Sequence, residues 1–295
     1  MTARGWVRMA AITAGLALPP TLAAQYDACR PGAASNEAKT LAIFSVPLAF
    51  SQSAPPGGGH AGDRAGGGSA GLTLGLEAAS VPSVDPATAT PTICRPGKGP
   101  ENTGLLPALA RPRLGLALPL GLALEASWIP PVRVNGVKAN LIGLALSRSV
   151  GHPDGLVAAV RAHATFGSIR APVTCDRDAT GDPSSECFHG EVSDDRLAPN
   201  IMGVEASVGW SMAGGRLRPY LGSGYSRLQP RFQVSFTNQF GALDTTRVEV
   251  NLDRAVFFGG AAWQLSDHLA ITGEIYAVPA DAATGRLVIR RTLGS

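Results

Sequence analysis

Apolar residues alternate with small or polar ones along most of this chain. Within residues 111–131, leucine occupies every second position from 114 to 118 and again from 120 to 124. This period of two is that of a β-strand with one apolar face, and Pro119 interrupts it where a tight turn would fall. The other face holds mostly glycine and alanine, whereas a soluble sandwich would place hydrophilic side chains there. The pattern is typical of a barrel wall with lipid outside and a crowded interior.

The same alternation continues from residue 70 onward and predicts an all-β fold, a transmembrane antiparallel β-barrel of ten strands, with eight and twelve as the alternatives. Short connections alternate with longer polar ones, as periplasmic turns and outer loops do in such barrels. The motif Glu-x-x-x-[Val/Ile]-Pro occurs at 77–82, 125–130 and 274–279, each time on a strand running outward, where proline ends the ladder. The predicted strands are 70–82, 105–118, 120–130, 133–149, 156–170, 200–212, 216–236, 245–265, 268–279 and 285–293.

The N-terminus carries an export signal. Arg4 and Arg8 precede an apolar run that ends before small residues at 23–24, which predicts a signal peptide over residues 1–24. The alternative is a membrane anchor, but the run is shorter than the roughly 20 residues needed to span a bilayer. Cleavage would remove two of the 25 basic residues and none of the 22 acidic ones, so the mature chain is nearly neutral. Nothing in this balance indicates a nucleic-acid partner.

Residues 25–69 differ from the predicted barrel at 70–295. Ser35 followed by Glu37 resembles a helix start, although residues 40–50 also suit a strand and Pro47 would end or kink a helix. A Gly/Pro-rich linker follows. The small side chains predicted to face inward leave volume that something must occupy. We therefore expect residues 35–50 to form a helical or irregular plug; the alternative is a segment lying loosely in the periplasm. The small inward residues are Gly115, Ala117, Gly121, Ala123, Gly143, Ala145 and Ser147.

Four cysteines in an exported chain predict two disulfides. Cys175 and Cys187 share one polar segment and are the obvious pair, which leaves Cys29 for Cys94. The latter bond would tie the plug to an outer loop. Metal binding is the alternative, but the chain has no CxxC motif with accompanying histidines, and the acidic residues of 176–186 lack EF-hand spacing. No metal or cofactor is expected.

Strand parity also assigns charged residues to the lumen. They could line a water-filled pore, or they could pair with one another and close the lumen, because charges removed from water must be compensated. For a barrel this small, paired charges are the better expectation. Aromatic residues near strand ends, such as Trp128 and Trp210, suit the headgroup level. The predicted lumen-facing residues are Glu77, Glu125, Arg161, His163, Glu205, Arg218, Arg247, Glu249 and Glu274.

Catalytic chemistry is not indicated. Of the five histidines, only His163 falls in the interior of a predicted strand, since His268 lies at the turn where its strand begins, and no nucleophile can be assigned to His163. The glycine runs at 57–59 and 66–68 lie in the linker without a strand–turn–helix context, so they do not form a phosphate-binding loop. We expect no enzyme.

Two hairpins carry a family resemblance. The sequences LRPYLGSGY at 217–225 and GGAAWQLSDHLAITGE at 259–274 resemble the outer-membrane β-barrel proteins of the OmpA-like and OmpW-like kind, and the likeness covers about residues 200–279. It implies the outer membrane of a diderm, Gram-negative bacterium, contact with its lipid and lipopolysaccharide, and insertion by the barrel-assembly machinery. The expected function is a small porin-like or facilitated-diffusion channel gated by the N-terminal segment; the alternative is a non-conducting structural or surface-interaction barrel.

Overall fold

Ten antiparallel strands close into a barrel in the computed structural model, which describes residues 28–56, 71–152 and 154–293. Each strand pairs with the next one around the wall, and β1 pairs with β16 to close it, as the alternation predicted. The predicted signal peptide and most of the linker lie outside the described residues. The barrel strands are β1 (Gly71–Ser80), β2 (Ala108–Leu118), β3 (Leu122–Ile129), β5 (Val137–Gly151), β6 (Leu156–Ala171), β8 (Ile201–Trp210), β9 (Leu217–Leu228), β14 (Leu252–Ser266), β15 (Leu269–Val278) and β16 (Ala282–Leu293).

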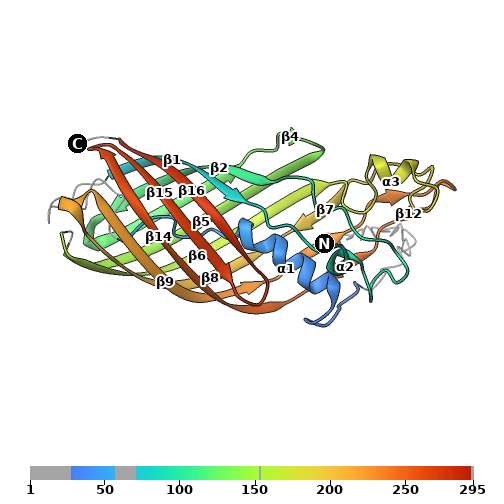
Figure 1. Cartoon of the computed structure of the whole chain (residues 1–295), viewed down its shortest axis with the longest axis horizontal. Helices are drawn as coiled ribbons and strands as arrows, with labels where there is room; N and C mark the ends of the chain where they lie inside the picture. Colours follow the sequence, from blue (N-terminus) through green and yellow to red (C-terminus); the bar gives the residue numbers. More distant parts are fainter. Residues whose placement is uncertain (1–27, 57–70, 153, 294–295) are drawn as a thin grey trace, which may run out of the picture.

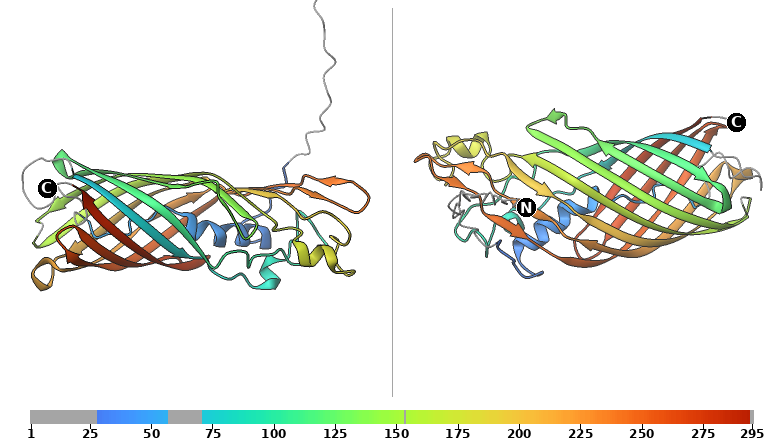
Figure 2. Two further views of the ribbon diagram at one scale, coloured as in Figure 1. Left: turned by 90° about the horizontal axis from the view of Figure 1, so that it is seen from above. Right: turned by 180° about the vertical axis from the view of Figure 1, so that it is seen from behind.

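Short turns gather at one end of the barrel and long connections at the other (Figures 1 and 2). By the rule for such barrels, the first end is periplasmic and the second extracellular. Residues 81–107, 172–200 and 229–251 form an extension beyond the extracellular rim. It contains α2 (Pro86–Ala89), α3 (Arg177–Gly181), β7 (Asp195–Ala198), β10 (Arg231–Gln233), β11 (Phe236–Thr237), β12 (Leu243–Asp244) and β13 (Arg247–Glu249); β4 (Arg133–Val134) continues the β3–β5 hairpin, and η2 (Pro119–Gly121) and η3 (Ala213–Gly215) form periplasmic turns.

The three Glu-x-x-x-[Val/Ile]-Pro motifs share one position in the fold. Their prolines follow the extracellular ends of β1, β3 and β15, and their glutamates lie three or four residues before those strand ends, on the inner face. Proline has no N–H for the ladder, so it fits where pairing stops. The motif therefore marks each outward strand that presents a glutamate to the lumen.

The outer surface of the barrel is apolar. Large side chains at alternate positions remain exposed there, including Leu74, Leu76, Val160 and Ile275. An exposed apolar surface of this extent is explained by lipid contact. Aromatic residues lie near both rims, with Trp128 and Tyr225 toward the outside and Trp210 and Trp263 toward the periplasm. Among the described residues, no helix is both long and apolar enough to cross a bilayer.

Residues predicted as either helix or strand form α1 (Asn36–Leu48), near the barrel axis at the extracellular end (Figures 1 and 2). The Ser35 hydroxyl caps it by accepting a hydrogen bond from the Ala38 N–H. Pro47 lies in the last turn, one residue before the helix ends. Most α1 side chains are buried, because they pack against the inner face of the barrel and of its extension.

Candidate functional site

Residues 28–56, here called the luminal segment, traverse the interior of the barrel. At the extracellular end, Cys29 exchanges two backbone hydrogen bonds with β13, of 2.8 and 2.9 Å, and forms a disulfide with Cys94. At the other end, Pro56 lies against Gly209 near the periplasmic end of β8, where a Cβ would be 2.9 Å from the proline Cδ. The segment therefore spans most of the length of the lumen.

Five arginines from the barrel wall, here called the arginine cage, surround the C-terminal end of α1. They donate hydrogen bonds to backbone carbonyls of residues 46–53. The last carbonyls of a helix lack partners within the helix and carry partial negative charge, so cations suit this position. The pairs are Arg286 with Val46 (2.9 Å) and Ala49 (2.8 Å), Arg111 with Leu48 (3.3 Å) and Ala49 (2.9 Å), Arg161 with Phe50 (2.5 Å), Arg113 with Ser51 (2.9 Å), and Arg290 with Ser53.

Phe50 occupies the centre of the arginine cage and is fully buried. The guanidinium carbons of Arg113, Arg161 and Arg111 lie 4.3, 4.9 and 5.4 Å from the centroid of its ring. A cation within about 6 Å of an aromatic face is attracted by the ring quadrupole, and the attraction is larger when both groups are out of water. One side chain of the luminal segment thus interacts with three cations of the wall.

Four glutamates of the wall offset most of the positive charge of the five-arginine cage. Glu77 is fully buried and contacts three of its arginines. Glu274 accepts hydrogen bonds of 2.8 Å from both the Ser53 N–H and the Tyr220 hydroxyl, and so holds the luminal segment directly. The ion pairs are Glu77 with Arg111 (2.7 Å), Arg113 (2.8 Å) and Arg286 (3.2 Å), Glu125 with Arg113 (2.9 Å) and Arg161 (3.6 Å), and Glu205 with Arg161 (3.1 Å) and His163 (3.3 Å).

The small residues of the β2–β3–β5 wall make room for the luminal segment. Gly143 on β5 illustrates this, since a Cβ there would lie 3.0 Å from Phe50 Cγ and 2.5 Å from Ser127 Oγ. The volume inferred from the sequence is therefore occupied by the chain itself. A wall of large side chains could have filled the lumen without such a segment.

Gly143→Ala is expected to destabilise the folded barrel by about 1–3 kcal/mol, the usual cost of overpacking a filled interior. The added methyl group would displace Phe50 or Ser127, because it would lie closer to both than van der Waals contact allows. The measurement is urea unfolding of the micelle-bound protein, followed by tryptophan fluorescence. Gly273→Ala on β15 is the matched control, because nothing lies within 4 Å of a Cβ there. Equal unfolding midpoints for the two variants would contradict the tight fit at Phe50.

Seven of the nine charged residues predicted for the lumen lie on its inner face. Glu77, Glu125, Glu205 and Glu274 meet the luminal segment or the arginine cage, with Arg161 and His163 beside them. Arg218 is partly buried and has the inward parity of Tyr220, two residues further along β9.

The prediction is wrong for Arg247 and Glu249. On β13 and the start of β14, Val248, Val250 and Leu252 are buried at 2–4 % exposure and face inward, whereas Arg247 is exposed and Glu249 pairs at 3.2 Å with Arg30, itself largely exposed. The physical reason is that β13 lies in the extension beyond the membrane. Its outer face meets water instead of lipid, so the polar residues face out and the apolar ones pack on α1.

Sequence reasoning missed four members of the arginine cage: Arg111, Arg113, Arg286 and Arg290. Strand parity contained the signal for two of them, since Arg111 and Arg113 share the inward parity of Gly115. The pairing register of neighbouring strands is a second signal, because it places Glu77 directly opposite Arg111 and Glu274 opposite Arg286. Neighbouring strands had to be aligned before these pairs became visible.

The interior of the barrel is thus charged and hydrogen-bonded, while the surface facing away from it is apolar. A closed barrel with this inside-out distribution is stable only with lipid around it. The fold is a closed transmembrane β-barrel of the kind found in outer membranes.

Comparison with known proteins gives similarities of architecture. The barrel is similar to the outer membrane protease OmpT from Escherichia coli at 8% identity, over 76% of this chain and 93% of that one, with a TM-score of 0.39. The β-domain of the Bordetella autotransporter BrkA is similar at 12% identity, over 77% of this chain and 99% of that one, with a TM-score of 0.36. Ail of Yersinia pestis is similar at 9% identity, over 77% of this chain and 99% of that one, with a TM-score of 0.31. No protein-family model and no curated protein matches the chain.

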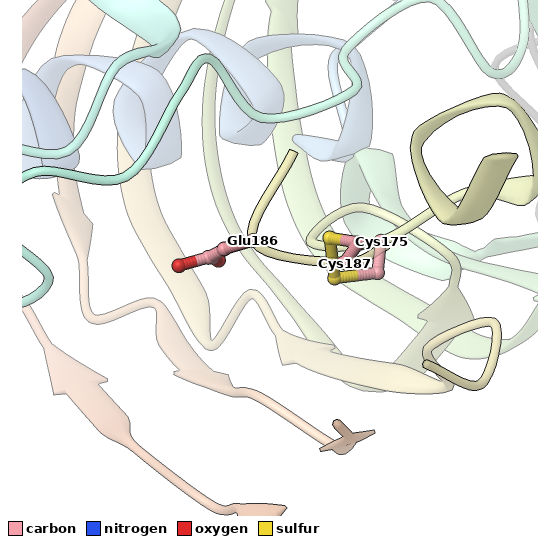
Figure 3. A group of neighbouring side chains, drawn as sticks. All are labelled: Cys175, Glu186 and Cys187. Carbon is pink, nitrogen blue, oxygen red and sulfur yellow. A yellow bond between two sulfur atoms is a disulfide. The ribbon is translucent and has the colours of Figure 1, made fainter. Parts of the chain in front are cut away.

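The second disulfide joins Cys175 to Cys187 in the extracellular extension, so both predicted pairings are confirmed. Glu186 is the one carboxylate close enough to these sulfurs to suggest a metal site within the described part of the chain. Figure 3 shows the two sulfurs bonded to each other and the Glu186 carboxylate pointing away from them. That carboxylate instead pairs with Arg95 at 2.7 Å. This group is therefore structural, because the disulfide occupies both sulfur ligands.

Glu101 in the extension has a pKa raised to about 7, because burial outweighs the attraction of Lys98 and Arg95, and Asp195 adds repulsion. A carboxyl with a raised pKa binds more protons in the folded than in the unfolded state. Its contribution to stability is complete below its ordinary pKa of 4.5 and is lost as the pH rises through about 7. We therefore expect proteolysis of the extension to accelerate between pH 5 and pH 8, and Glu101→Gln to flatten that profile.

The measurement is the rate of limited proteolysis of the refolded barrel, taken relative to Glu191→Gln, an exposed matched control in the same extension. Dividing by the control removes the pH dependence of the protease. Parallel profiles for Glu101→Gln and the control would show that Glu101 does not titrate in this range.

Proposed function

We propose that this outer-membrane barrel is a small facilitated-diffusion channel that the luminal segment holds shut. The observation that carries the proposal is that a separate segment lies along the lumen and occupies the space between the charged side chains of the wall. Polar contacts hold the segment there. Its backbone carbonyls accept hydrogen bonds from wall arginines, the Ser53 N–H donates to Glu274, and the Phe50 ring lies among arginine cations. Without it, the wall would present charges and small residues, as a water-filled pore does.

Single-channel conductance in a planar bilayer tests the proposal. The full chain is expected to be silent, and a variant lacking residues 29–56 is expected to conduct, because its arginines, glutamates and glycines would then face water. The matched control removes residues 238–242, which lie at a hairpin tip of the extension between β11 and β12. It should remain silent.

The second candidate is a non-conducting structural or surface-interaction barrel. The observation favouring it is the dense Glu–Arg network, in which Glu77 alone meets three arginines. If the variant lacking residues 29–56 folds and remains silent, the wall closes on itself and this candidate replaces the channel. Surrounding lipid and lipopolysaccharide, insertion by the barrel-assembly machinery and a non-catalytic role belong to both candidates.

The Cys29–Cys94 disulfide is expected to anchor the extracellular end of the luminal segment. The double variant Cys29→Ser/Cys94→Ser should lose about 2–4 kcal/mol of stability and show more frequent channel openings, because the bond closes a loop with a sequence separation of 65. The matched control is Cys175→Ser/Cys187→Ser, which opens a loop with a separation of 12 outside the lumen. Equal opening frequencies in the two variants would show that the disulfide does not restrain the segment.

A further inference from the structure

An apolar cavity of about 130 Å³ lies between α1 and the extracellular end of the barrel wall. Leu41, Phe44 and Leu48 of α1 form one side. Strand residues of the rim and extension form the other, among them Ile169 and Phe232. Residues 81–106 contribute the remaining side.

The charged residues around this cavity are already paired. The Glu37 carboxylate accepts hydrogen bonds of 2.6–2.9 Å from three backbone N–H groups of residues 92–94. Asp195 accepts from the Thr174 and Ser235 N–H groups and the Ser193 hydroxyl. Arg95 contacts Glu101, Glu186 and Asp244 at 2.7–3.4 Å, and Lys98 contacts Glu101 at 3.0 Å. Among the residues that the structure describes around this cavity, no charge is left free for a charged ligand.

Size and polarity together define the occupant. The lining of this cavity is mostly apolar, the cavity is partly open to solvent, and a cavity of about 150 Å³ is large enough to hold benzene. We propose that the cavity binds a small neutral apolar molecule, about the size of a single aromatic ring. Phe44, which is only partly buried, presents its ring as one wall of this site.

The inference is independent of the proposed channel, because binding is measured on the closed, full-length barrel. The probe is fluorobenzene, followed by ¹⁹F NMR on the protein in phosphatidylcholine nanodiscs. Partition into lipid gives a response that is linear in concentration, whereas the cavity is expected to add a saturable component.

Ala89→Leu fills the cavity, since Ala89 is 3% exposed and lines it. We expect this variant to bind fluorobenzene at least tenfold more weakly. Ala108→Leu is the matched control: the same change at an exposed position at the start of β2, which does not itself line the cavity, should leave binding unchanged. Retention of the heat-sensitive gel shift of a folded barrel confirms that each variant folds. Where Ala89→Leu does not fold, Ala171→Leu fills the cavity from β6 instead.

Crystals soaked in iodobenzene give a second measurement, with an anomalous iodine peak expected between Phe44 and Leu106. A purely linear NMR response overturns the proposal. So does saturable binding that the cavity-filling variants leave unchanged, and so does an iodine peak confined to the lipid-facing surface.

Discussion

Replacing Glu77 with alanine is expected to cost about 3–5 kcal/mol of folding stability, or to prevent the barrel from folding in micelles. Glu77 is fully buried, and its carboxylate contacts Arg111, Arg113 and Arg286 at 2.7–3.2 Å. Removing it would leave three buried guanidinium groups without their shared counter-charge. That is costlier than losing an exposed ion pair, which is worth at most about 1 kcal/mol.

Urea unfolding and the heat-sensitive shift on gels measure this effect. Glu191→Ala, at an exposed position of the extension, is the matched control and should change stability by less than about 0.5 kcal/mol. The double variant Glu77→Ala/Arg286→Met removes charge from both sides and is expected to recover part of the loss. If Glu77→Ala unfolds at the same urea concentration as the control, the ion-pair network does not support the barrel.

Replacing Phe50 with alanine is expected to destabilise the barrel by about 3–5 kcal/mol and to loosen the luminal segment. The ring is fully buried between the arginine cage and Gly143, so its removal leaves a cavity beside desolvated cations. In planar bilayers this variant should show openings that the unmodified chain lacks, because the segment loses its central contact.

Phe50→Leu separates the two contributions of the ring. Leucine retains most of the apolar volume but has no quadrupole, so this variant should lose only about 2 kcal/mol, the value of a desolvated cation–π contact. Phe257→Ala, whose ring is half exposed on the lipid-facing side of β14, is the control for loss of a phenyl group and should not open the channel. Silent Phe50→Ala and Phe257→Ala barrels would contradict a closing role for Phe50.

Much of the architecture could be predicted from local patterns. Alternation along each strand, turn residues such as Pro119 and the spacing of the cysteines are short-range signals, and they led to ten strands and two disulfides. The Glu-x-x-x-[Val/Ile]-Pro motif is also a short-range signal, and it gave the direction of three strands. Most of the lumen-facing charges followed from parity alone, because each strand position faces either in or out.

The amino-acid sequence by itself thus determined the barrel, its orientation and most of its inner face. Tertiary structure decided the features that depend on contacts between distant segments and on whether lipid or water surrounds a strand. Residues 36–48 became a helix because a closed wall offers no free strand edge inside it, and a helix satisfies its own backbone. Arg247 and Glu249 turned outward because β13 lies above the lipid, where water reverses the preference of each face. The arginine cage formed from distant strands meeting at one helix end, a proximity that no local pattern contains.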